Sequence, residues 1–156
     1  MRITLGFEYG RCDVCGEEKQ VRILLDDKKA VRICVDCANR LRETSEEVLL
    51  KYGRPYKRLE EGISIFDIKL LVVDEDMWEG FKEELTEYLK GKYEVTLARG
   101  RKFEKKFKKV ERGAISNSLS VFREVDFKLA IDPKSEKVRE RADVVVSSPL
   151  EVMQYL

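Results

Sequence analysis

Four cysteines in two pairs constrain this 156-residue chain more than any other feature. Two residues separate Cys12 from Cys15, and two separate Cys34 from Cys37. This spacing lets both thiolates of a pair face one ion from a tight turn, and two such turns complete a tetrahedral shell of four sulfurs. The pattern therefore predicts one bound Zn²⁺, with iron as the alternative metal. Because the chain supplies all four ligands, the metal is expected to be structural rather than catalytic.

Two disulfides or a cluster of buried free thiols would be the alternatives to a metal site. Charged neighbours such as Arg11, Asp13 and Asp36 argue against a buried thiol cluster. Disulfides are rare in the cytoplasm. We expect a cytoplasmic protein, because the chain starts without a secretory signal and no apolar run is long enough to span a membrane. Few Asn and Gln beside abundant Lys and Glu are typical of a thermophile.

The residues around the cysteines predict a treble clef over residues 1–53. Apolar segments at 21–25 and 30–33 flank a polar turn and indicate a β-hairpin. Residues 38–42 then begin a helix after the second pair, and a further helix over 46–50 is expected to follow. The order is thus knuckle, hairpin and helix. A segment this short cannot be held by its own core, so the metal is expected to supply most of its folding energy.

Residues 12–40 resemble the C4 zinc-binding domain of the Clp-family protein unfoldase. The matching motifs are Cys12-x2-Cys15-Gly, Val21-Arg-x-Leu24 and Ile33-Cys-x2-Cys37. The resemblance implies a treble clef that dimerises and docks adaptors and substrates. It does not extend to that family's ATPase core, because the chain has no G-x4-G-K-[ST] phosphate loop.

After a connector at 54–62, residues 63–156 are predicted to form an α/β domain with a mainly parallel sheet, Rossmann-like or receiver-like. Short apolar runs that alternate with amphipathic segments are typical of this class. The expected strands are 63–66, 68–73, 93–97, 126–131 and 144–146, and the expected helices lie between Asp76 and Gly91 and at 101–112, 133–141 and 149–156. Residues 113–125 match no element.

Residues 68–149 resemble a degenerate response-regulator receiver domain. The resemblance lies in Leu70-Leu-Val-Val-Asp74-Glu-Asp76 and in Asp143-Val-Val-Val-x-Ser-Pro149. It implies the receiver topology. It does not imply phosphorylation, because Ser148 stands where that family has a lysine and no aspartate clearly ends a central strand as the phosphate acceptor.

An apolar strand followed by Asp-x-Asp is also similar to the haloacid-dehalogenase-type phosphohydrolases. This resemblance implies Asp74 as nucleophile, Asp76 as acid and base, Thr96 as the phosphate-binding hydroxyl and Asp132 as a Mg²⁺ ligand. The Gly-Thr that follows the aspartates in that family is absent here. The other interpretation is that Asp74 and Asp76 are N-cap and first-turn residues, which the helix dipole stabilises.

Residues 92–112 hold nine Lys or Arg against three Glu. A helix over 101–112 would place Phe103, Phe107 and Val110 inward. Its outer face would then carry a set of cations suited to the phosphates of DNA or RNA. These are Arg101, Lys102, Lys105, Lys106, Lys108 and Lys109. The alternative is an ordinary solvated helix.

The lack of histidine and the small net charge each exclude a class of function. The chain has no histidine, which excludes Ser-His-Asp and Cys-His catalysis, and its formal net charge of +1 argues against nucleic-acid binding by bulk charge. We therefore predict a non-enzymatic zinc-binding interaction protein, a regulator or adaptor in transcription or translation. Its zinc module would bind a protein partner or a second copy in a homodimer, and its basic helix DNA or RNA. A Mg²⁺-dependent phosphohydrolase built on Asp74 and Asp76 is the alternative.

Overall fold

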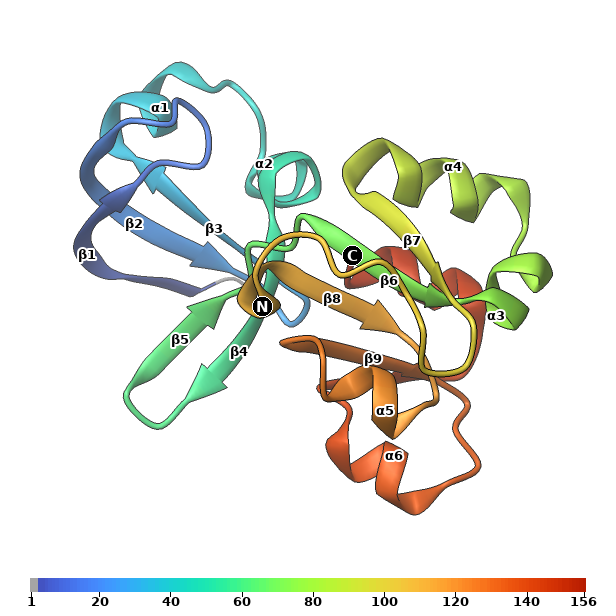
Figure 1. Ribbon diagram of the computed structural model, residues 1–156. Coiled ribbons are helices and arrows are strands. Elements are labelled where there is room, and N and C mark those ends of the chain that lie inside the picture. The colour runs from blue at the N-terminus through green and yellow to red at the C-terminus, as the bar shows by residue number, and fades with distance from the viewer. Residues whose placement is uncertain (1–2) are drawn as a thin grey trace. The chain divides into compact units, whose positions relative to one another are not determined.

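Two separate β-sheets organise the chain, one antiparallel and one parallel (Figure 1). The structure is a computed structural model, and residues 3–156 are described. The first compact unit comprises the residues up to Ile65 together with Tyr155, and the second comprises Phe66–Gln154 together with Leu156. The α/β character and the mainly parallel second sheet that the sequence predicts are confirmed.

The sheet of the first unit is antiparallel throughout, in the order β1-β2-β3-β4-β5. The predicted hairpin is confirmed: β2 and β3 pair from Val21 opposite Cys34 to Leu25 opposite Ala30. At its turn, the Asp26 carboxylate accepts hydrogen bonds from the backbone N–H groups of Lys28 and Lys29. The strands are β1 Ile3–Arg11, β2 Glu18–Leu25, β3 Lys29–Cys34, β4 Arg54–Leu59 and β5 Gly62–Ile65.

Two helices, α1 (Val35–Arg40) and α2 (Ser45–Tyr52), follow the hairpin. Thr44 caps α2, because its side chain accepts a hydrogen bond of 3.3 Å from the backbone N–H of Glu47. Val48 and Leu49 of α2 are buried in the same cluster as three of the cysteines. The order of turn, hairpin and helix expected for a treble clef is thus present.

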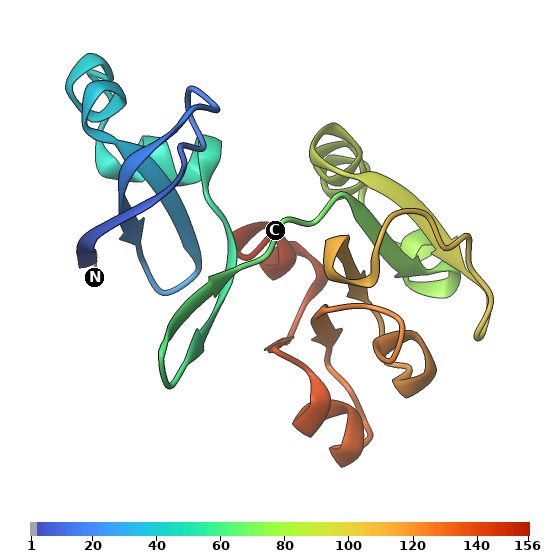
Figure 2. The ribbon, with the colours of Figure 1, turned by 60° about the vertical axis from the view of Figure 1, so that its left-hand side comes forward.

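Residues 54–62 do not form a connector. They belong to β4 and β5, a hairpin that pairs with β3 and is visible in green in Figure 2. Tyr56 packs against the cluster of Ile23, Leu25 and Ala30, and its hydroxyl donates a hydrogen bond of 2.6 Å to the carbonyl of Asp26. The sequence does not predict this hairpin, because its residues are mostly polar. Only part of each strand packs against apolar side chains, so the strands show no clear alternation of apolar and polar residues.

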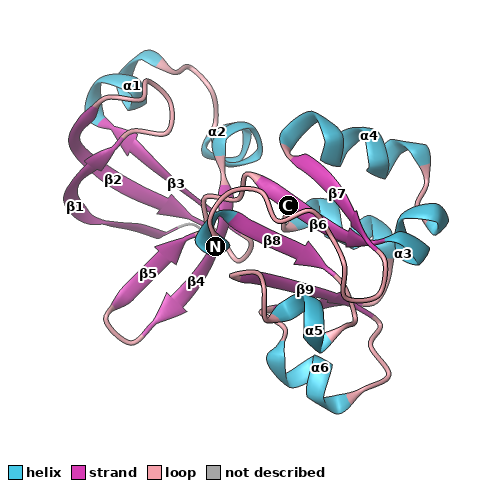
Figure 3. Cartoon of the chain, viewed as in Figure 1, coloured by secondary structure: helices cyan, strands magenta, loops and turns pink. Residues whose placement is uncertain are grey.

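The second unit has five parallel strands in the order β10-β9-β8-β6-β7 (Figure 3). Numbered along the unit, this is 2-1-3-4-5, the order of the flavodoxin-like doubly wound sheet. Residues of β6 are buried on both faces: Leu70 and Val72 pack with Phe103 and Val121, and Leu71 and Val73 alternate to the other face. The strands are β6 Leu70–Asp74, β7 Glu94–Ala98, β8 Arg112–Ile115, β9 Phe127–Ile131 and β10 Val144–Val146.

Short helices connect these strands. The segment expected as one helix after Asp76 is divided into α3 and α4, and the last expected helix is a 3₁₀ helix, η2. Next to α4, the side chains of Lys92 and Tyr93 donate hydrogen bonds of 2.7 and 2.9 Å to the carbonyl of Leu156. The helices are α3 Glu75–Gly80, α4 Glu83–Lys92, η1 Lys109–Glu111, α5 Leu119–Phe122, α6 Glu136–Arg141 and η2 Pro149–Gln154.

The predicted basic helix over 101–112 is wrong. The segment is irregular up to η1 and has an isolated bridge between Arg99 and Lys102. Phe103 packs on the sheet, but Phe107 is 45% exposed and has a φ of 61°. The guanidinium of Arg112 donates to the carbonyls of Lys106 and Phe107, groups that a helix would pair internally.

Residues 113–125, which matched no element, supply the centre of the parallel sheet. They contain most of β8 and all of α5. A Cβ added at Gly113 would lie 2.9 Å from Cδ1 of Ile68, so a side chain at this position would require Ile68 to shift. The strand is four residues long and begins with Arg and Gly, which explains why its sequence pattern is weak.

Candidate functional site

The four cysteines converge on one point. Their sulfur atoms all lie within 4.8 Å of one another, and they could hold a metal ion. Cys12, Cys34 and Cys37 are buried, while Cys15 is half-buried. Sulfurs bound to one tetrahedral Zn²⁺ are about 3.8 Å apart, given Zn–S bonds of about 2.3 Å. The Sγ atoms of Cys15 and Cys34 are 4.0 Å apart, so the donor set fits a metal of this kind.

Backbone geometry directs hydrogen-bond donors at these sulfurs. The N–H of Cys34 donates to Sγ of Cys12 at 3.4 Å, and the N–H of Cys37 donates to Sγ of Cys34 at 3.4 Å, which also caps α1. The guanidinium of Arg40 donates to Sγ of Cys37 at 3.4 Å. Such donors stabilise thiolates, which are the form that binds a metal.

The thiols differ in how readily they ionise. Burial raises the pKa of Cys12, but hydrogen bonds from the backbone of Cys15, Cys34 and Val14 outweigh it and lower this pKa to about 7. Burial raises the pKa of Cys37 to about 12, although the hydrogen bond from Arg40 opposes the change. A cation at the centre of the cluster would therefore have to displace a firmly held proton from Cys37.

Asp13, between the first two cysteines, holds their turn in place. Its carboxylate accepts a hydrogen bond of 2.8 Å from the backbone N–H of Arg32 and one of 2.6 Å from the guanidinium of Arg54. The side chains of Asp13 and Arg54 are 13% and 26% exposed. Sequence reasoning treated Asp13 only as a charged neighbour, because its partner is 41 residues away along the chain.

A second group of polar side chains lies where β6 and β8 end. The hydroxyl of Ser116 donates to one oxygen of Asp74 at 2.7 Å, and the backbone N–H of Asn117 donates to the other at 3.3 Å. Burial raises the pKa of Asp74, and these two hydrogen bonds oppose that increase. Asp74 occupies the N-cap position of α3, but its side chain makes no cap hydrogen bond. It links two neighbouring strands instead.

This strand edge borders a cavity of about 590 Å³. In doubly wound sheets, ligands bind beyond the carboxyl ends of the strands, where the strand order reverses. Here that point lies between β6 and β8. The cavity is lined by Asp74, Glu75, Asp76, Met77, Ala98, Arg99, Gly100 and Ser118.

The residues that the phosphohydrolase alternative requires are not brought together. Among residues 3–156, the cysteine cluster is the one group of three or more Cys, Asp or Glu placed to hold a metal, so Asp74, Asp76 and Asp132 form no such group. Thr96 lies opposite Val72, before the end of its strand. Asp132 follows β9, and β8 lies between β9 and β6. The structure does not support this alternative.

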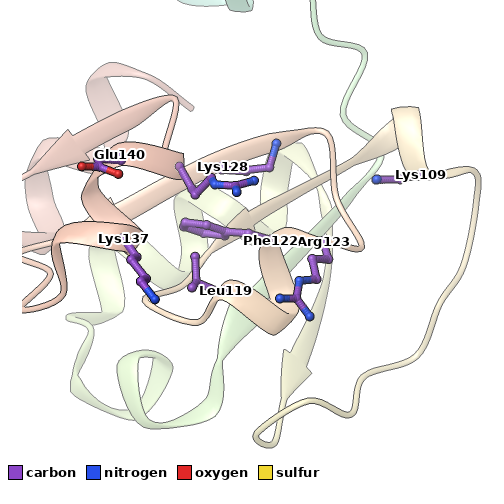
Figure 4. Close-up of a pocket in the computed structure, with 8 residues that line it drawn as sticks. Lys109, Leu119, Phe122, Arg123, Lys128, Lys137 and Glu140 are labelled. Atoms are coloured by element: carbon purple, nitrogen blue, oxygen red, sulfur yellow. The ribbon is translucent and has the colours of Figure 1, made fainter.

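The six cations predicted to bind nucleic acid are exposed, but they share no helix face. Two of them are already paired: Lys105 is 3.4 Å from a carboxylate oxygen of Glu124, and Lys106 is 2.6 Å from one of Glu94. Lys109 lines a different cavity of about 610 Å³, shown in Figure 4. Sequence reasoning missed this cavity because its lining residues are spread over 33 positions, from Lys109 to Arg141.

The chain matches no protein-family model, no curated protein and no solved structure. In the part of the chain that the structure describes, no helix is long and apolar enough to cross a membrane.

Proposed function

We propose that this chain is a non-enzymatic binding protein whose first unit is organised around one structural Zn²⁺. The four-cysteine cluster carries the proposal: four sulfur donors lie within 4.8 Å, and three of the four residues are buried. A shell filled by protein ligands leaves no position for a substrate or water. The proposal includes a treble-clef domain over residues 1–53, which β4 and β5 extend to Ile65, and an α/β domain that begins at Phe66 rather than at residue 63.

The role of such a protein is to bind a partner, as a regulator or adaptor in transcription or translation. A protein partner at the zinc-bearing unit is supported by β1, which lies at the edge of its sheet. Phe7 and Tyr9 on this strand are 54% and 73% exposed. Exposed aromatic side chains are enriched at protein interfaces, and an edge strand can pair with an extended segment of a partner.

Metal analysis of the purified full chain tests the zinc centre. We expect one zinc per chain, and we expect Cys12→Ser and Cys37→Ser to lose it. Asp36→Asn is the matched control, because Asp36 lies between Cys34 and Cys37, is exposed and supplies no ligand atom to the cluster. Iron with a visible thiolate absorption band would replace zinc in the proposal, and a chain that binds no metal would overturn it.

A further inference from the structure

We propose that the second unit binds the phosphate groups of a nucleic-acid strand in the cavity between α5, β9 and α6. The cavity has a volume of about 610 Å³, within the range of ligand sites, which is about 300–1,000 Å³. Figure 4 shows side chains from α5, from β9 and from the segment before β8 around it. The lining residues are Lys109, Leu119, Phe122, Arg123, Lys128, Lys137, Glu140 and Arg141.

Five of these eight side chains are cations, and one, Glu140, is an anion. The whole chain has a formal net charge of only +1, so the excess is local and does not reflect composition. The positive charges that line this cavity repel one another, and an anionic ligand would reduce this repulsion. A C-terminal helix dipole accounts for Arg141 in the last turn of α6, but not for Lys109 in η1 or Lys128 on β9.

Four of the five cations of this cavity have no ion pair with any described residue, unlike other cations of the same unit. Elsewhere Lys69, Arg99 and Lys106 each lie within 3.0 Å of a carboxylate oxygen. Over residues 3–156, no ion pair includes any of four cavity cations. These are Lys109, Arg123, Lys137 and Arg141. The ammonium of Lys128 donates to the carbonyl of Asp126, a neutral acceptor, at 3.3 Å.

The chemistry of the lining fits phosphate carried by a polymer. Arginine binds phosphate through two parallel hydrogen bonds, and lysine adds point charge. Five cations exceed what a single phosphate group neutralises, whereas successive phosphates of a strand could engage all of them. Phe122 is 2% exposed and so offers no ring face on which a base could stack. We therefore expect the cavity to contact the sugar-phosphate backbone of the strand, in a way that does not depend on base sequence.

This inference rests on the proposed function as a binding protein, for which it names a nucleic-acid strand as the partner. Phosphate binding in this cavity does not require the metal of the first unit. Zinc content measured on the same samples therefore separates failure of this inference from failure of the zinc proposal. The test uses the full zinc-loaded chain and a fluorescent mixed-sequence single-stranded RNA of 20 nucleotides, with binding followed by anisotropy at 50 and 200 mM salt. We expect micromolar affinity that weakens about a hundredfold between these concentrations, the slope for about five phosphate contacts on a single strand.

Lys137→Gln combined with Arg141→Gln should weaken binding at least tenfold and reduce the salt slope by about 1.4, or about 0.7 for each contact. The matched control is Lys82→Gln with Lys90→Gln, which removes two exposed cations of the same unit that do not line the cavity and should change affinity less than twofold. The proposal is overturned by absent binding at 50 mM salt, or by equal effects of both pairs. It is also overturned if AMP or polyglutamate displaces the RNA at micromolar concentration, since the site would then take a free nucleotide or an acidic protein.

Discussion

At the scale of single residues, Asp13 lies outside the four sulfurs but holds the first cysteine turn in place. Its carboxylate joins the first cysteine turn to Arg32 and Arg54. Removing such an outer partner typically costs 10- to 100-fold in metal affinity, because the ligands lose their orientation. We expect Asp13→Ala to weaken zinc affinity by about this factor, as measured by competition with a chromogenic chelator.

Asp27→Ala is the control for this experiment, because Asp27 is an exposed aspartate in the hairpin turn of the same unit. It should leave zinc affinity unchanged. Equal affinities for wild type and Asp13→Ala would show that the turn keeps its geometry without this carboxylate.

Asp74 predicts a pH dependence in the second unit. Burial raises its pKa above the ordinary value of 3.8, so the folded state holds its proton more firmly than the unfolded state does. Its contribution to the free energy of unfolding is therefore greatest below pH 3.8 and falls as the pH rises through the folded-state pKa. We expect the stability of wild type relative to Asp74→Asn to decrease over this range, as measured by urea unfolding monitored on second-unit amide signals.

Glu79→Gln, which alters an exposed carboxylate of the same unit that does not contribute to the shift at Asp74, should keep the wild-type pH dependence. The interpretation fails if Asp74→Asn also keeps it. Near neutral pH, Asp74→Asn should in addition lose about 1 kcal/mol, because Ser116 and the N–H of Asn117 donate to different carboxylate oxygens and an amide keeps only one of them.

At the scale of elements, two glycines predict opposite effects of the same substitution. A Cβ at Gly53, where α2 ends, would overlap the carbonyl oxygen of Leu49 and lie 2.9 Å from Cβ of Lys29. A Cβ at Gly91 in α4 would meet nothing within 4 Å. We expect Gly53→Ala to destabilise its unit by about 1–3 kcal/mol and Gly91→Ala to stabilise its unit by about 0.5–1 kcal/mol.

Chemical denaturation of both variants, followed by signals from each unit, measures these changes. If Gly53→Ala had no effect, the end of α2 would have to shift away from β3 at little cost. A loss of stability in Gly91→Ala would mean that this position does not keep its helical backbone in solution.

At the scale of the whole molecule, the two units should respond differently to metal removal. Three of the four cysteines belong to the buried cluster of the first unit, so that cluster loses its centre when a metal leaves. Structural zinc supplies on the order of 10 kcal/mol of coupled folding energy. The buried clusters of the second unit contain no cysteine over the described residues. We expect a chelator to collapse the amide dispersion of residues up to 65 and to leave the signals of residues 66–154 in place.

Cys34→Ser should reproduce the chelated spectrum without any chelator, which excludes a direct effect of the reagent. Retained dispersion in the first unit after complete zinc removal would show that its apolar contacts suffice. Loss of both units together would show that they fold as one.

The sequence by itself determined the features that depend on local spacing. The two cysteine pairs predict the cluster, residues 21–33 predict the hairpin, and the apolar run before Asp74 predicts a strand buried on both faces. These patterns are readable because each property is set by neighbours within a few positions.

Only the tertiary structure decided the rest, because it depends on which distant segments meet. The spacing of Phe103 and Phe107 suggested a helix, but Phe107 finds no core to enter and the segment stays irregular. The short strand β8 becomes central because both of its edges find partners. The link from Asp13 to Arg54 and the cation-lined cavity likewise join residues far apart in sequence. Burial and the pairing of charges depend on contacts between residues that are far apart along the chain, so the pattern of neighbouring residues does not determine them.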